Sequence, residues 1–228
     1  MPKSIAIDGP AGAGKSTIAK RVSSGLGFIY IDTGAMYRAV ALKAINSGID
    51  TTSQKDLAEM MKDLNITISH DDNSQRIFLD GKDVSELIRT AEVSVGASNV
   101  AVFPEVRLKM VELQRKIAAD KDVVMDGRDI GSYVLPHANL KIFLTASVEE
   151  RARRRYEELL QKGQQVLFED VKKDMVYRDN NDSGRAFAPL VKVPDAIEVD
   201  STSLAVDEVV EKILYFYTNY ASIKNGEL

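Results

Sequence analysis

Short continuous apolar runs alternate along the chain with segments whose apolar residues recur at helical spacing. This alternation predicts a fold in which strands and helices follow one another. Short apolar runs closed by turn residues predict five strands, at residues 4–7, 28–31, 123–125, 140–144 and 196–199. Apolar residues at helical spacing predict helices at residues 15–26, 35–46, 104–119, 148–162, 167–178 and 204–220. Continuous apolar runs such as 123–125 are typical of parallel strands that helices cover on both faces. The pattern therefore predicts an α/β fold with a parallel five-stranded sheet between helices.

The pattern differs in residues 62–92. Apolar and polar residues alternate at 65–69 and again at 76–79, which predicts two short antiparallel strands. Turn-forming residues separate the two segments at 71–74, and Asp80-Gly81 forms a second turn. We interpret 62–92 as a small subdomain inserted into a single domain that spans residues 1–228. The polar tail, 224–228, is predicted to fray.

Composition and charge narrow the possible functions. The 228 residues carry a formal net charge of −4, whereas a protein that binds nucleic acid without sequence preference is usually basic. No apolar run is long enough for a membrane span. The chain has no cysteine, which predicts a cytoplasmic protein without disulfides or thiolate metal sites. Because no long exposed apolar stripe is evident, a monomer is expected.

Residues 9–16 match the phosphate-binding pattern G-x-x-x-x-G-K-[ST] at every fixed position. An apolar strand precedes the segment and an amphipathic helix follows it, as in P-loop NTPases. The alternative, a glycine-rich turn with a surface lysine, does not account for this context. Lys15 is expected to reach the β and γ phosphates of ATP, and the Ser16 hydroxyl to bind Mg²⁺. The predicted ATP-binding loop consists of Gly9, Pro10, Ala11, Gly12, Ala13, Gly14, Lys15, Ser16 and Thr17.

The residues after the strand 123–125 favour a kinase over other P-loop proteins. No N-K-x-D guanine-reading motif is present, and Asp126 lacks the adjacent glutamate with which motor ATPases activate water. A kinase must instead hold two anionic substrates together, for which arginine is well suited. Two arginines, Arg38 and Arg128, follow predicted strands. Others have the spacing of one helical face: Arg151, Arg154 and Arg155 form one set, and Arg178, Asp182 and Arg185 form a second.

Six segments resemble the bacterial cytidylate kinase family, within the nucleoside monophosphate kinases. They occur in family order and cover essentially the whole chain, including the insertion at 62–92. The segments are GPAGAGKST at 9–17, DTGAMYR at 32–38, SNVA at 98–101 with Arg107, DGRDIG at 126–131, ERARRR at 150–155 and RDNNDSGRAFAPL at 178–190.

The resemblance implies a P-loop kinase that phosphorylates CMP and dCMP with ATP and Mg²⁺, and it implies roles for particular residues. Arg38, Arg128, Arg178 and Arg185 would hold phosphates, the last three of them as catalytic groups together with Lys15. Ser98, Arg107 and Asp129 would read cytosine, and Asp182 would hold the ribose. Arg154 would cover ATP in a short lid at 150–165, and the inserted subdomain at 62–92 would bind the monophosphate. Thr33 stands where many relatives have serine, and its hydroxyl would bind a phosphate or the base.

Two other interpretations remain open at this stage. One is a kinase of another small acceptor, such as shikimate, AMP or UMP. The other is a regulator that binds ATP without transferring phosphate.

Overall fold

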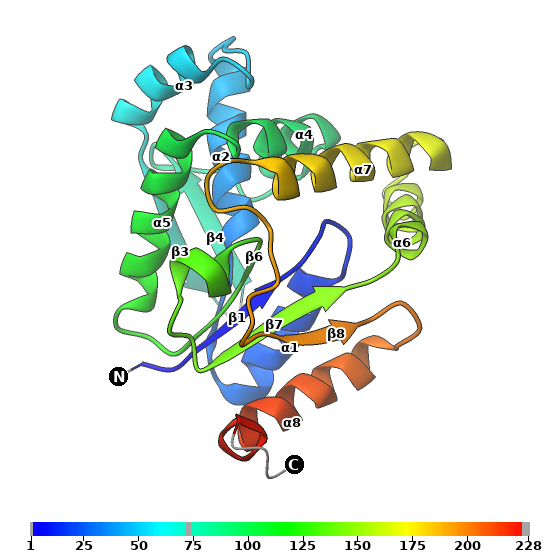
Figure 1. The fold of residues 1–228 in the computed structure, drawn as a ribbon. Helices are drawn as coiled ribbons and strands as arrows, with labels where there is room; N and C mark the ends of the chain where they lie inside the picture. Colours follow the sequence, from blue (N-terminus) through cyan, green and yellow to red (C-terminus); the bar gives the residue numbers. More distant parts are fainter. Residues whose placement is uncertain (1, 72–73, 225–228) are drawn as a thin grey trace.

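Five parallel strands form the central sheet of the computed structural model, which describes residues 2–71 and 74–224 (Figure 1). Their order in the sheet is β2-β6-β1-β7-β8, so the first strand lies at the centre. The predicted parallel five-stranded sheet is confirmed, with most strands one or two residues longer than the apolar runs. The strands are β1 (Ser4–Asp8), β2 (Ile29–Asp32), β6 (Val123–Gly127), β7 (Leu140–Thr145) and β8 (Ile197–Asp200).

Strand β1 illustrates why the runs are continuously apolar. Ile5 and Ile7 pack in the cluster formed with helices α1 (Lys15–Leu26) and α8 (Val206–Lys224), whereas Ala6 packs in the cluster on the opposite face of the sheet. Residues of α5 (Pro104–Ala118) belong to that second cluster. Because helices cover both faces of the sheet, every side chain of the strand must be apolar or paired. Burial of apolar side chains on both faces stabilises the core.

Residues at the ends of the strands begin the helices. The Asp32 carboxylate accepts a hydrogen bond from the Ala35 N–H, so α2 (Thr33–Asn46) starts directly after β2. The Ser147 hydroxyl accepts from the Glu150 N–H at the start of α6 (Val148–Gln161). Gly27 ends α1 in a left-handed conformation, with φ of +68°. The caps by Asp32 and Ser147 place the N-termini of α2 and α6 at the carboxyl edge of the sheet.

The predicted antiparallel strands within 62–92 are confirmed as β3 (Ile66–Asp71) and β4 (Ser74–Leu79), and β5 (Lys82–Asp83) extends them to a three-stranded sheet. The Asp80-Gly81 turn is also confirmed, whereas residues 72–73 of the first predicted turn lie outside the described residues. This sheet shares one apolar core with α2 and with α4 (Ala91–Val100). The extent of the inserted subdomain, 62–92, remains a prediction.

Several helical segments have too short or too mixed a pattern to be recognised from sequence. Helix α7 (Phe168–Gly184) continues well beyond the predicted end at residue 178. The apolar pattern stops earlier because the last turns of the helix are polar and line a cleft. The unpredicted segments are α3 (Gln54–Met60), η1 (Met61–Asp63), η2 (Leu87–Arg89), α4 and the π-helical turn η3 (Ile130–Val134).

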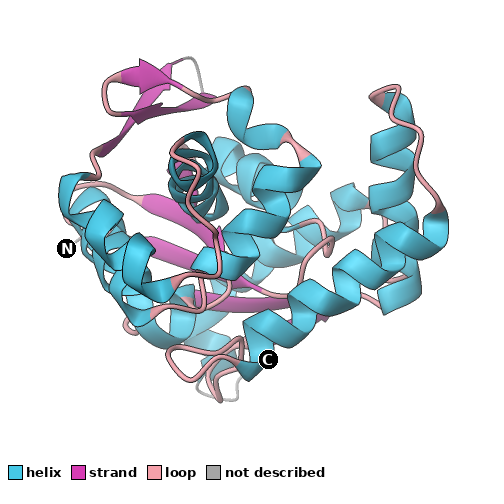
Figure 2. Ribbon diagram, turned by 90° about the horizontal axis from the view of Figure 1, so that it is seen from above, coloured by secondary structure: helices cyan, strands magenta, loops and turns pink. Residues whose placement is uncertain are grey.

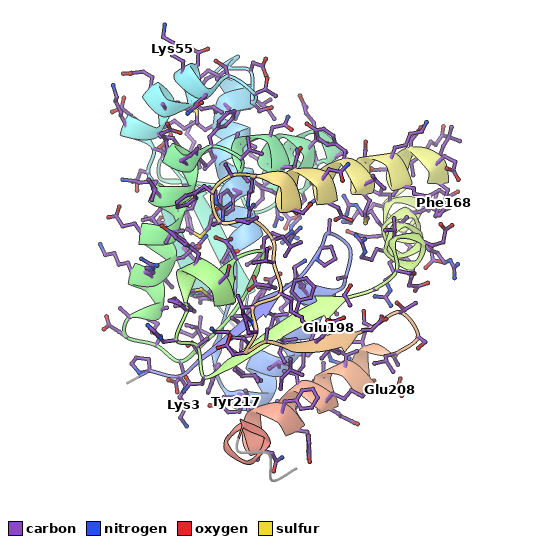
Figure 3. The ribbon with its side chains drawn as sticks, in the orientation of Figure 1. Lys3, Lys55, Phe168, Glu198, Glu208 and Tyr217 are labelled. Atoms are coloured by element: carbon purple, nitrogen blue, oxygen red, sulfur yellow. The ribbon has the colours of Figure 1, made fainter. Side chains whose placement is uncertain are left out.

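Helices α6 and α7 form a pair at the end of the molecule opposite the three-stranded sheet (Figure 2). The rings of Tyr156 and Phe168 meet edge to face at 5.8 Å, where α7 begins, and Figure 3 shows Phe168 at the outer end of that helix. None of the helices in the described part of the chain combines the length and apolarity needed to cross a bilayer. The predicted frayed tail is residues 224–228, of which 225–228 lie outside the described residues.

Candidate active site

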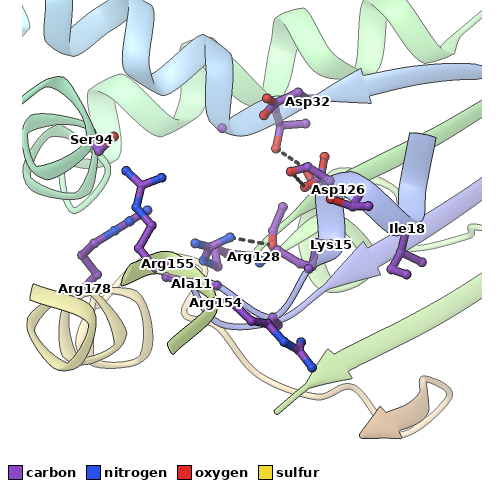
Figure 4. A pocket seen from close by; sticks show the side chains of 18 of the residues that line it. Ala11, Lys15, Ile18, Asp32, Ser94, Asp126, Arg128, Arg154, Arg155 and Arg178 are labelled. Carbon is purple, nitrogen blue, oxygen red and sulfur yellow. Dashed lines mark hydrogen bonds between the residues drawn. The ribbon is translucent and has the colours of Figure 1, made fainter. Parts of the chain in front are cut away.

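A cleft of about 860 Å³ opens at the carboxyl ends of β1, β2 and β6, beneath α6 and α7 (Figure 4). This is the edge of a parallel sheet where ligands bind, because loops and helix N-termini converge there. The residues predicted from sequence to bind nucleotides come from seven separate parts of the chain. The fold brings most of them together, since all of them except Gly9, Pro10 and Arg151 line this cleft.

The loop between β1 and α1 has the shape that the glycines allow. Gly12 and Gly14 have φ of +74° and +88°, which side chains with a Cβ rarely adopt. Gly9 packs against β7 so closely that a Cβ would lie 1.9 Å from the Leu144 carbonyl oxygen. The loop can therefore curl around a phosphate at the positive end of α1. Gly9 shapes this loop from behind the cleft.

Lys15 is buried at the base of this loop, with an exposed fraction of 5%. Its Nζ donates a hydrogen bond to the Pro10 carbonyl at 2.7 Å. Burial, and then the charge of Arg128, hold the pKa of Lys15 well below its usual range. An anionic phosphate in the cleft would supply the negative charge that this buried ammonium lacks.

Ser16 and Asp126 form the part of the cleft suited to a magnesium ion. The Ser16 Oγ donates to Asp126 Oδ2 at 2.9 Å, and the Tyr30 hydroxyl donates to Asp126 Oδ1 at 2.8 Å. Burial and the nearby Asp32 raise the pKa of Asp126 to about 6, and a cation would offset that cost. Within the described ranges, no three His, Cys, Asp or Glu side chains gather as a metal cluster. Mg²⁺ suits such a site, because it commonly binds one carboxylate together with phosphates and water.

Arginines surround the opposite end of the cleft. Arg128 Nε donates to Asp182 Oδ2 at 2.6 Å, and Arg185 lies 3.6 Å from the other oxygen of that carboxylate. Arg38 pairs with Asp32 at 2.8 Å. Burial and the charge of Arg128 lower the pKa of Arg178 to about 10. These four arginines, together with Arg107, outnumber the carboxylates of Asp32, Asp129 and Asp182, so the region is poised to bind phosphate.

A buried ion pair between Arg107 and Asp129 forms the innermost wall, and the Tyr37 ring lies 5.5 Å from the Arg107 guanidinium carbon. Arg185 lies 3.5 Å from Oδ1 of the same aspartate. Within the described residues, the Nε of Arg107 has no hydrogen-bond partner, although it is fully buried. Such an unsatisfied buried donor is costly, and a ligand could satisfy it.

The carboxyl end of β6 and the turn after it are tied to strand β1. Asp8 accepts hydrogen bonds from the N–H groups of Ile130 and Gly131, at 2.8 and 2.7 Å. These bonds hold the turn that carries Asp129 beside the glycine loop. The Thr33 hydroxyl donates to the Asp126 carbonyl at 2.7 Å, so its single proton is already used. The Ser98 hydroxyl, on α4, accepts from Asn181 at 3.2 Å.

The three arginines of α6 do not share one role. Arg154 donates to the backbone and side-chain oxygens of Ser201, at 2.6 and 3.1 Å, beside the glycine loop. Arg155 extends toward Arg178 in the open part of the cleft (Figure 4). Arg151 is buried instead, and the expectation that it faces the phosphates is wrong.

Arg151 holds the loop from below. It donates to the Ala11 and Ala146 carbonyls, both at 2.9 Å, and pairs with Asp179 at 2.7 Å. Helical spacing identified the shared face of α6, but packing against α7 decided which arginine on it is buried. Four further cleft residues were assigned no role from sequence: Tyr30 lies within a predicted strand, Asp32 and Asp126 directly follow predicted strands, and Arg89 lies in the insertion.

A glycine loop between a central parallel strand and a helix, facing an arginine-rich cleft, defines a P-loop kinase. A solved structure of a gluconokinase from Sinorhizobium meliloti 1021 has this fold, with a TM-score of 0.51 at 13% identity over 99% of this chain and 97% of that chain. At this identity the likeness concerns the fold alone.

Sequence comparisons identify the family. The cytidylate kinase family model matches residues 5–219. The chain is 53% identical to a cytidylate kinase of Desulfitobacterium hafniense (strain Y51), over 94% of this chain and 92% of that protein. It is 55% identical to a cytidylate kinase of Alkaliphilus oremlandii (strain OhILAs), over 92% of this chain and 95% of that protein. The chain belongs to the cytidylate kinase family.

Proposed function

We propose that this protein transfers the terminal phosphoryl group of ATP to CMP, and also to dCMP, by in-line attack. The observation that carries the proposal is that the same cleft holds the glycine loop at one end and the buried Arg107–Asp129 pair at the other, with arginines between them. Family membership supports the same activity.

The donor end would hold ATP through the loop 9–17. Backbone N–H groups and the N-terminus of α1 would bind its phosphates, and Lys15 would neutralise charge on the group in transit. Ser16 and Asp126 would hold Mg²⁺, which supplies positive charge to the phosphate oxygens. Arg154 would lie over the nucleotide, next to Ser201.

The acceptor end would hold the monophosphate through Arg38, Arg128, Arg178 and Arg185. A phosphate is already a nucleophilic anion, so no catalytic base is needed and the arginines offset the repulsion between the two substrates. Asp129 would accept the amino proton of cytosine, Arg107 and Ser98 would bind the remaining polar atoms of the base, and Asp182 would bind the ribose.

An assay of ADP release across CMP, dCMP, UMP, AMP and shikimate tests the proposal. CMP is expected to give the highest kcat/KM together with dCMP. A higher kcat/KM with another acceptor would mean a different kinase, and ATP binding without turnover of any acceptor would mean a regulator.

We further propose that residues 150–165 act as a lid that closes when both substrates bind. Arg154 and Arg155 are now held by Glu150 and Glu158, in exposed or half-exposed pairs of the kind that contribute little. Amide hydrogen exchange in this segment is expected to slow more with a non-hydrolysable ATP analogue plus CMP than with either alone. Equal exchange in all four states would rule out substrate-driven closure.

A further inference from the structure

One cross-strand pair of the inserted sheet, His70 and Gln75, meets the edge strand of the central sheet. The two residues lie directly opposite each other in the β3–β4 register. On the same face, the preceding pairs Ile66–Leu79 and Ile68–Ile77 pack into the apolar core shared with α2. The row of apolar pairs thus ends in a polar pair where the sheet reaches β2.

This pair binds the backbone of β2. The His70 Nε2 lies 3.0 Å from the Tyr30 carbonyl oxygen, and it must donate because a carbonyl only accepts. Gln75 accepts from the Asp32 N–H at 2.7 Å and donates to the Asp32 carbonyl at 3.2 Å. Strand β2 is at the edge of the central sheet, so these outward-facing backbone groups have no neighbouring strand to bind.

Both β2 residues act in the cleft through their side chains. The Tyr30 hydroxyl donates to Asp126, which lies beside Ser16. The Asp32 carboxylate caps α2 and pairs with Arg38 at 2.8 Å. The position of the β2 backbone therefore decides where the Arg38 guanidinium lies.

We propose that His70 and Gln75 are positioning residues for acceptor binding. By fixing the end of β2, they hold Asp32 and, through it, Arg38 in the orientation that meets the acceptor phosphate. This role rests on the proposed function of the cleft. A merely structural role would change the melting temperature and leave the KM for CMP as it is.

Gln75→Leu and His70→Leu test the proposal, because leucine keeps side-chain bulk but removes the hydrogen bonds to β2. The KM for CMP is expected to rise about tenfold in Gln75→Leu, which loses two hydrogen bonds, and about threefold in His70→Leu. In Gln75→Leu, whose lost hydrogen bonds are to Asp32 and not to Tyr30, the KM for ATP and the kcat are expected to stay within about twofold of wild type.

Two further variants serve as controls. Thr67 is exposed on the opposite face of the same strand, so Thr67→Ala is expected to match wild type. His70→Gln keeps an amide nitrogen able to donate to the Tyr30 carbonyl, and it is expected to restore the KM for CMP to within about twofold.

A readout that does not depend on turnover separates this proposal from the proposed function. In ¹H–¹⁵N spectra of the free protein, the Arg38 Nε–H signal, assigned with Arg38→Lys, is expected to shift in both leucine variants and not in Thr67→Ala. Failure of the wild type to phosphorylate CMP would contradict the proposed function alone. An unmoved Arg38 signal, or equal increases in KM for CMP and ATP in Gln75→Leu, would overturn the positioning role.

Discussion

Replacing Lys15 with methionine is expected to lower kcat with CMP by about three orders of magnitude at saturating ATP. Charge stabilisation by positioned cations supplies nearly all of the catalysis in phosphoryl transfer, and Lys15 is the cation of the glycine loop. Methionine fills a similar volume without the charge, so the loss measures the ammonium group. A kcat near that of wild type would contradict the assignment of Lys15.

The same variant is expected to keep the fold, and its melting temperature should equal or exceed that of wild type. The Lys15 ammonium is buried, and its pKa is lowered by that burial, so the free protein bears a cost in keeping it charged. Lys55→Met is the matched control, because Lys55 is exposed on α3, far from the cleft (Figure 3). It should leave both kcat and melting temperature unchanged.

A second large effect is expected in the discrimination between cytosine and uracil in the acceptor nucleotide. Wild-type protein should prefer CMP over UMP by at least about a hundredfold in kcat/KM. UMP has a carbonyl where CMP has its amino group, and that carbonyl would face the Asp129 carboxylate with no proton between them. Asp129→Asn should shrink this preference, because an amide can donate to the carbonyl of uracil. Measuring kcat/KM for both acceptors in both proteins decides the matter.

The contacts of Asp129 add a cost in stability to this variant. The carboxylate lies between Arg107 and Arg185, so the amide leaves two buried guanidiniums with less compensating charge. Breaking a buried ion pair commonly costs about 3–5 kcal/mol, and the free energy of unfolding should fall by an amount of that order. Asp195→Asn breaks the pair with Lys141 away from the base and should leave the CMP to UMP ratio unchanged.

An unchanged ratio in Asp129→Asn would show that Asp129 only orients the arginines. In that case activity with CMP and with UMP would fall in equal proportion, because both acceptors would lose the same phosphate contacts. Comparing the activity ratio with the melting temperature therefore separates base reading from support of the site.

Sequence patterns predicted those parts of the protein whose physical cause is local. A continuous apolar run is needed wherever helices cover both faces of a strand, so the five strands could be found without knowing their neighbours. Gly12 and Gly14 adopt conformations that favour glycine, so the phosphate-binding loop could be predicted from its residues alone. Helix α4 was missed because its apolar residues bury against α2 without a clear helical period.

The partners of each charged side chain were decided only by the tertiary structure. Arg151 and Arg154 share one face of α6, yet packing buries one under the glycine loop and leaves the other in the cleft. Asp126 meets Ser16 across 110 residues of sequence, because β6 lies beside β1 in the sheet. The sequence by itself determined the strands, the loop and the family. Which cations meet which carboxylates depends on strand order and helix packing, since these contacts join residues far apart along the chain.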